Sequence, residues 1–218
     1  MDSTTIKKAI IRSQHCQRNW DLSKSIPQEH MDMLFTAATQ CPSKQNIAFY
    51  SVHFITNREV IEAIHAHTDG FTVTYAPKQT TTNTQTLANL VVVFEEYNFH
   101  QDLLLDQYPR NDQALEFITT GELCDETKEL YRRDRDMAVG IAAGYLNLTA
   151  NLLGYNTGCC ACFDNKAIKP ILGLTGKVIL LMGIGYRDET MNRRVHHKNH
   201  DFVFPTKVKQ PIAVKVWE

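Results

Sequence analysis

The chain has 218 residues, of which 43% are hydrophobic and 22% charged, an ordinary globular composition with length for one large domain or two small ones. The formal net charge of −1 excludes general nucleic-acid binding, which needs a strong basic excess. No apolar run approaches the roughly 20 residues that span a bilayer, and the polar N-terminus has no signal-peptide core, so we expect a cytoplasmic protein with free cysteine thiols and no membrane partner.

Two helices are predicted before residue 42. The first covers residues 3–13, where apolar side chains fall on one face. The second starts near Ser25, which can cap it, and has Pro27 in its first turn. Apolar residues follow at helical spacing until Pro42 ends the helix.

The next segments predict strands with a helix between them. Residues 48–56 are β-branched and aromatic and predict a strand, whereas residues 58–66 predict a helix. The threonine-rich stretch 72–86 predicts a loop. A continuous apolar run at 89–95 then predicts a buried strand.

The second half of the chain contains the strongest helical pattern. Residues 97–135 give a weak signal, with a helix expected around 126–135. Residues 137–153 predict a long helix that Gly154 ends. Small residues at 140–144 allow another backbone to approach this helix closely.

Two further strands are predicted, at 177–186 and at 212–217. The sequence has no internal repeat, low-complexity run or composition shift that would mark a boundary. We therefore predict a single domain over residues 1–218, with helices and strands mixed around one core.

Three separated segments contain the chemically informative residues. The first is His15-Cys16-Gln17-Arg18-Asn19-Trp20-Asp21, and the second is Pro42-Ser43-Lys44-Gln45-Asn46. The third runs from Tyr155 to Asp164, directly after the small-residue helix. Their order and spacing resemble the nitroreductase family, whose members bind FMN at a homodimer interface, and the resemblance covers most of the chain.

The resemblance implies a phosphate-binding end near the N-terminus, where cations and backbone N–H groups suit a phosphate. The family motif R-S-x-R-x-F matches residues 15–20, so that Arg18 stands for its second arginine. His15 and Cys16 replace the first arginine and the serine. The family also has basic residues after its last core strand, and Arg194 fits that spacing better than Arg193. The residues implied at this end are Gln14, His15, Cys16, Arg18, Arg193 and Arg194.

The resemblance also implies residues around the flavin ring, which needs hydrogen-bonding groups at its pyrimidine edge and a donor near N5. Ser43 and Asn46 match the serine and asparagine of the family's P-S-S-x-N motif. Asn83 and Gln85 resemble a segment that reaches the ring edge. Backbone N–H groups at 160–162 are implied near N5 and O4, with Ala161 and Cys162 as the catalytic donors and Cys160 beside them.

The fold that the resemblance implies is α+β. It has a mostly antiparallel central sheet flanked by helices, and a C-terminal segment, from residue 211 to 217 here, exchanged within a homodimer. The implied activity is hydride transfer from NADH or NADPH through FMN to a small-molecule acceptor such as a nitroaromatic or a quinone. The flavin does this chemistry, while the protein orients the reactants.

Other interpretations remain open from the residues alone. Cys159, Cys160 and Cys162, with His196 and His200 four residues apart, are candidate metal ligands, although adjacent cysteines are awkward on one ion and we expect no metal. A thiol that undergoes redox cycling beside the flavin is a further alternative.

Other functions on the same fold also stay open. One is a different flavin chemistry, such as dehalogenation, dehydrogenation or flavin breakdown, decided by a substrate cap at residues 97–135. Another is a non-catalytic flavin- or metal-binding protein, because His15, Cys16 and Ala48 depart from the family motifs.

Overall fold

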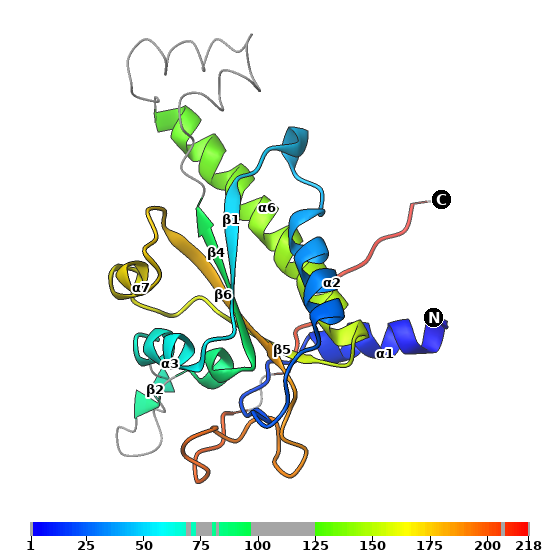
Figure 1. The fold of residues 1–218 in the computed structure, drawn as a ribbon. Coiled ribbons are helices and arrows are strands. Elements are labelled where there is room, and N and C mark those ends of the chain that lie inside the picture. The colour runs from blue at the N-terminus through cyan, green and yellow to red at the C-terminus, as the bar shows by residue number, and fades with distance from the viewer. Residues whose placement is uncertain are drawn as a thin grey trace.

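An antiparallel sheet of four strands forms the centre of the described structure (Figure 1). The computed structural model describes residues 2–68, 71–72, 80–81, 83–96, 125–205 and 208–217. The strand order is β1-β4-β6-β5, and every neighbouring pair is antiparallel. The strands are β1 (Tyr50–Ile55), β4 (Leu90–Glu96), β5 (Asn156–Cys160) and β6 (Val178–Gly185). The predicted α+β fold with an antiparallel sheet is confirmed.

The central strands are mostly apolar because helices cover both faces of the sheet. Leu90 to Phe94 of β4 have no exposed surface. Val92 and Phe94 pack into the core on one face, and Val91 and Val93 into the core on the other, as the alternation of side chains in a strand requires.

One face of the sheet is covered by α6 (Asp125–Leu152), which crosses it beside α2 (Gln28–Thr39) (Figure 1). Leu34 of α2 and Leu146 of α6 are fully buried in the core with Met182 of β6. The first helix, α1 (Ser3–Ser13), packs against α6 as well. The two helical segments predicted at 126–135 and 137–153 form this one helix of 28 residues.

The opposite face is covered by α3 (Arg58–Ala66) and α7 (Asn165–Leu172). Ile61, Ile64 and Ile168 are buried there against β4 and β6. The sequence analysis did not predict α7. Its N-cap is Asp164, whose side chain accepts from two backbone N–H groups.

Several element predictions differ from the structure. The second helix is preceded by Pro27 at its N-cap, and no side chain caps it, so the cap proposed for Ser25 is wrong. The sequence analysis did not predict the strand β5. The stretch 72–86 was predicted to be a loop, but the short 3₁₀ helix η2 (Thr84–Leu87) begins within it. The two-residue strands β2 (Phe71–Thr72) and β3 (Thr80–Thr81) also lie in this region and pair with each other.

The C-terminal segment is not a strand in the single chain. Residues 208–217 form an extended arm that leaves the body of the molecule near α1 (Figure 1). Ile212, Val214 and Trp217 are 76%, 81% and 90% exposed. The predicted strand at 212–217 therefore has no partner within the described chain. Residues 97–124, most of the predicted substrate cap, lie outside the described residues.

None of the described helices is both long and apolar enough to cross a membrane.

Candidate functional site

The segment after α1 is fixed beside β5 and η2. The backbone N–H of Gln17 donates to the carbonyl oxygen of Thr157 at 2.8 Å, and that of Arg18 donates to the carbonyl oxygen of Arg193 at 3.0 Å. Trp20 is buried, and its indole N–H donates to the carbonyl oxygen of Thr84 at 2.9 Å. These contacts place the side chain of Arg18 at the end of β5.

The guanidinium group of Arg18 lies between two predicted site residues. Its Nη1 donates to Oδ1 of Asn83 at 2.6 Å and to Oε1 of Gln85 at 2.5 Å. The amide nitrogen of Gln85 donates to the carbonyl oxygen of Cys159 at 2.5 Å, which holds that side chain against β5. Arg18, Asn83 and Gln85 therefore form one polar cluster. The sequence analysis had divided these residues between the two ends of the cofactor.

Glycine residues allow this cluster to lie directly on the sheet. A Cβ at Gly158 of β5 would come within 2.8 Å of Cγ of Gln85, and one at Gly183 of β6 within 1.9 Å of its carbonyl oxygen. A side chain at either position would therefore displace η2 and move Gln85 away from Arg18.

An aromatic pair completes the surroundings of Arg18. Its guanidinium carbon lies 4.1 Å from the ring centre of Phe204, within cation–π range. The Phe204 ring stacks on His196 at an interplanar angle of 15°. Burial lowers the pKa of Arg18, while the thiols of Cys16 and Cys160 act in the opposite direction. The sequence analysis missed Phe204, although Phe202 and Phe204 stand out as apolar residues in a polar segment.

Two cysteine thiols lie beside the cluster and are protonated at neutral pH. Cys160 accepts a hydrogen bond from Nδ2 of Asn83 at 3.1 Å. Burial raises the pKa of Cys160 to about 11 and that of Cys159 to about 12. The thiolate is the reactive form of cysteine, so these values disfavour redox cycling by either residue. Ala161 and Cys162 follow β5 and are exposed, as donors for a ligand need to be.

The predicted phosphate-end residues are only partly brought together. His15 and Arg193 line a cavity of about 300 Å³ next to α1. Burial, and then the charge of Arg193, lower the pKa of His15, so His15 is mainly neutral at pH 7. Arg194 instead donates to the carbonyl oxygen of Phe204 at 3.1 Å and does not line the cavity, and Gln14 is the exposed C-cap of α1. Arg193 rather than Arg194 is thus the cation beside His15.

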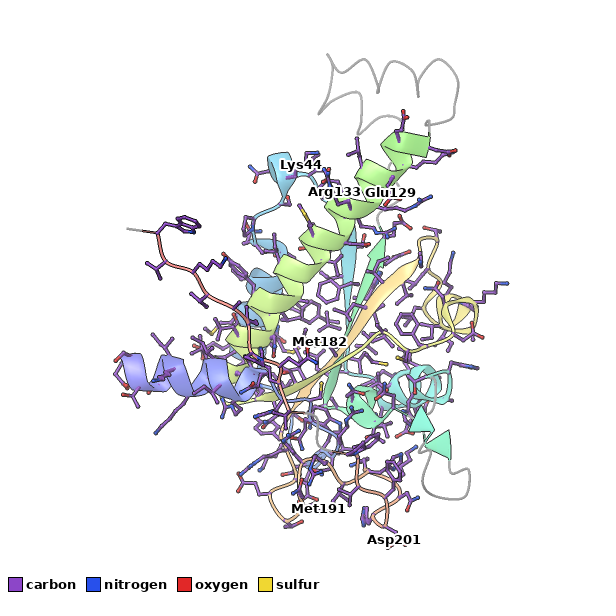
Figure 2. All side chains as sticks on the ribbon, turned by 180° about the vertical axis from the view of Figure 1, so that it is seen from behind. Lys44, Glu129, Arg133, Met182, Met191 and Asp201 are labelled. Atoms are coloured by element: carbon purple, nitrogen blue, oxygen red, sulfur yellow. The ribbon has the colours of Figure 1, made fainter. Side chains whose placement is uncertain are left out.

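Ser43 and Asn46 lie at the other end of the sheet. They precede Tyr50, which pairs with Glu96 at the far end of β4, whereas Gln85 precedes Leu90 at the near end. The length of β4 puts the two groups about 20 Å apart. Figure 2 shows Lys44 beside α6 toward one end of the molecule and Met191, in the loop after β6, toward the opposite end. One chain therefore does not bring all the predicted cofactor residues into one site.

The segment at Ser43 and Asn46 has a local structure of its own and contacts α6. It forms the 3₁₀ turn η1 (Lys44–Asn46), where Asn46 adopts a left-handed backbone with φ of 59°, the one such non-glycine among the described residues. Lys44 pairs at 2.5 Å with Asp134, which also pairs with Arg133 on α6. A cavity of about 900 Å³ lies next to this turn and is lined by Ser43, Asn46 and Tyr145 of α6, among others.

The metal alternative gains no support from the described part of the chain. No three His, Cys, Asp or Glu side chains there are grouped so that they could hold an ion. In particular, the thiol of Cys160 is already engaged with Asn83, and Nδ1 of His196 accepts from the backbone N–H groups of Lys198 and Asn199.

The fold and the Arg18 cluster define an α+β protein with a polar site at the end of its central sheet. The model of the nitroreductase family matches residues 11–186. The chain belongs to the nitroreductase family. Among proteins with curated descriptions, none matches the sequence.

Solved structures share the whole fold at low sequence identity. A protein from Bacillus subtilis named as a nitroreductase has a TM-score of 0.68 and 13% identity, with 97% of each chain covered. A protein from Staphylococcus epidermidis named as an NAD(P)H:FMN oxidoreductase has a TM-score of 0.61 and 18% identity, with 92% of each chain covered. A nitroreductase from Exiguobacterium sibiricum, in complex with FMN, has a TM-score of 0.62 and 17% identity over 97% of this chain and 94% of the other.

Proposed function

We propose that this chain is an FMN-dependent oxidoreductase that uses NADH or NADPH to reduce a small electrophile such as a nitroaromatic or a quinone. Membership of the nitroreductase family supports the general class. Two structural neighbours, one named as an NAD(P)H:FMN oxidoreductase and one bound to FMN, support the cofactor and the donor. The observation that carries the proposal is the Arg18 cluster, because it puts a fixed cation and two amides at the position where the fold exposes residues 161–162.

The residues of this cluster fit a flavin ring edge. Arg18 uses Nη1 for Asn83 and Gln85, and its remaining N–H groups are available in the described structure. A guanidinium group stays charged near neutral pH even when burial lowers its pKa. Bound FMN would supply the hydride chemistry at N5. Arg18 would stabilise negative charge at the pyrimidine edge, and the exposed backbone at Ala161 and Cys162 would orient the ring.

We further propose a homodimer in which the second chain completes the site. Ser43 and Asn46 are about 20 Å from Gln85 in one chain, so both groups can contact one flavin only if a partner supplies one of them. The outer face of α6 is suited to this contact. Its exposed residues are Met137, Gly140, Ile141, Gly144 and Tyr145. The exposed arm at 211–217 would be the segment exchanged between chains.

The visible absorption spectrum tests the proposed function. We expect flavin bands in the protein after FMN is added, and loss of those bands when NADH or NADPH is added without oxygen. Arg18→Ala should weaken FMN binding by at least about tenfold, because a charge-assisted contact is lost. Lys166→Glu, an exposed change on α7, serves as the control. If no flavin binds to the folded wild-type protein, the proposed function is wrong.

A further inference from the structure

A loop after β6 brings Phe204 to Arg18. It covers residues 194–204, and we call it the 194–204 loop. An antiparallel bridge between Val195 and Val203 closes it. The backbone N–H of Phe204 donates to the carbonyl oxygen of Arg194 at 2.9 Å, and Nη1 of Arg194 donates back to the carbonyl oxygen of Phe204 at 3.1 Å. These contacts fix the backbone at Phe204.

The 194–204 loop is also attached to the segment that contains Arg18. Asn19, the next residue after Arg18, has no exposed surface. Its Nδ2 donates to the carbonyl oxygen of Asn192 at 2.6 Å and to that of Val195 at 3.3 Å. Arg18 and the 194–204 loop are therefore held next to each other by contacts that do not involve an aromatic ring.

The ring of Phe204 is buried against the guanidinium group of Arg18. Phe204 is 4% exposed, and its ring centre lies 4.1 Å from the guanidinium carbon. The ring of His196 stacks on that of Phe204 with the two centres 5.9 Å apart. The face of an aromatic ring carries partial negative charge and attracts a cation, most strongly where water is excluded. The contact therefore stabilises the guanidinium group in one orientation.

The partners of Arg18 leave its positive charge in place. Its hydrogen bonds go to the neutral amide oxygens of Asn83 and Gln85, and no carboxylate of the described residues pairs with it. Burial removes water from the guanidinium group and lowers its pKa. An ion pair with a carboxylate would offset this loss of hydration, but it would also neutralise the charge. An aromatic face offsets part of the loss and leaves the full charge available to a ligand.

We propose that Phe204 is a positioning residue, whose ring holds the guanidinium group of Arg18 at the flavin ring edge and stabilises its charge without neutralising it. This role rests on the proposed function, because FMN is the ligand at that edge. Two-electron reduction of FMN adds negative charge to its pyrimidine edge, and a fixed cation there binds the more negative form more tightly. Phe204 therefore raises the reduction potential of bound FMN.

The midpoint potential of bound FMN, measured by spectroelectrochemistry, tests this role. Phe204→Leu removes the ring face and keeps an apolar side chain. We expect reduced FMN to lose about tenfold more affinity than oxidised FMN in this variant, which lowers the potential by about 30 mV for a two-electron couple. A purely structural role for Phe204 would weaken the binding of both forms equally and leave the potential unchanged.

Phe202→Leu is the matched control, because Phe202 lies in the same loop and is 9% exposed. Its ring meets that of Phe204 edge-on, with the centres 5.0 Å apart, whereas Arg18 lies over the ring of Phe204. Phe202→Leu therefore loosens the packing of the loop without removing the aromatic face at Arg18. We expect this variant to keep the wild-type potential, and an equal fall in both leucine variants would overturn the role of Phe204.

A fluorinated ring keeps the test decisive if Phe204→Leu does not fold. Replacement of Phe204 by pentafluorophenylalanine nearly preserves the shape of the side chain, but the fluorine atoms draw electrons away from the ring face. The potential should fall as in Phe204→Leu. A wild-type potential in the folded variants at position 204 would overturn the role of Phe204 and leave the proposed function in place. If the folded wild-type protein binds no FMN, the proposed function and the role of Phe204 are both wrong.

Discussion

The positions of single side chains in the candidate site are determined by tertiary contacts that cannot be read from the sequence. Arg18 is a clear case, because the motif assigned it to the phosphate end of the cofactor, whereas in the structure it lies with the residues predicted for the ring edge. Its hydrogen bonds to Asn83 and Gln85 join residues that are 65 and 67 positions apart. Phe204 reaches Arg18 from a still more distant segment. The identity of these residues was therefore predictable in part, whereas their grouping was not.

The thiols beside Arg18 give a prediction at this scale. Burial holds the pKa of Cys160 at about 11, so at pH 8 almost all of this residue is in the unreactive thiol form. We expect iodoacetamide at pH 8 to modify exposed Cys162 and to leave Cys160 and Cys159 unmodified, as read by peptide mass spectrometry.

Denatured protein provides the control, because all the cysteines should react once burial is lost. The direction of the pH dependence follows from the raised pKa, because Cys160 should become reactive only as the pH approaches 11. Rapid alkylation of Cys160 in the folded protein at pH 8 would contradict this assignment and would reopen a redox role for the thiol.

Whole elements were predictable where the hydrophobic pattern is strong. The apolar run at 89–95 predicts β4, and the helical spacing before Pro42 predicts α2, because burial on the core dictates both patterns. The strand β5 was missed because Gly158, Cys159 and Cys160 do not have the β-branched side chains typical of a strand. Gly158 is required because Gln85 packs closely against it. This requirement of the tertiary structure weakens the strand pattern in the local sequence.

The outer face of α6 gives a prediction at the element scale. Apart from the neighbouring backbone of α6 itself, no atom of the described residues lies within 4 Å of a Cβ built on Gly140 or Gly144, so each chain tolerates a side chain there. Gly144→Arg should raise the stability of the single chain by up to about 1 kcal/mol through helix propensity. If a partner packs on this face, however, the same change should convert a dimer into a monomer, as measured by sedimentation velocity.

Loss of the dimer in Gly144→Arg should be accompanied by weaker FMN binding, because the site then lacks its second half. Lys166→Glu changes the charge by two units at an exposed position of α7 and should leave the dimer intact. A Gly144→Arg protein that is still dimeric would exclude the outer face of α6 as the contact.

At the scale of the whole molecule, the extended arm is the part that the single chain does not explain. Its alternating apolar residues at 212, 214 and 216 predict a strand. In the single chain these residues are exposed, because a strand forms only when it can pair with the edge of another strand. The edge strand β1 has one neighbour in the described sheet, β4, so one of its sides is open for pairing. The local sequence indicates that the arm is able to form a strand, and in the proposed homodimer a second chain would supply the edge that it pairs with.

Removal of residues 211–218 tests the role of the arm. Because Ile212, Val214 and Trp217 are at least 76% exposed in the single chain, their loss should leave the secondary structure by circular dichroism unchanged. We expect the shortened protein to be monomeric and to bind FMN weakly. A shortened protein that keeps both its dimer and its flavin would show that the arm is not exchanged.

The separation between Asn46 and Gln85 has a consequence for cofactor retention. If two chains must meet to enclose one flavin, occupancy obeys mass action in the protein as well as in FMN. Dilution alone would then release the cofactor, even at constant free FMN. Conversely, FMN would shift the equilibrium between monomer and dimer toward the dimer, so that the cell's flavin supply would set how much of this protein is assembled.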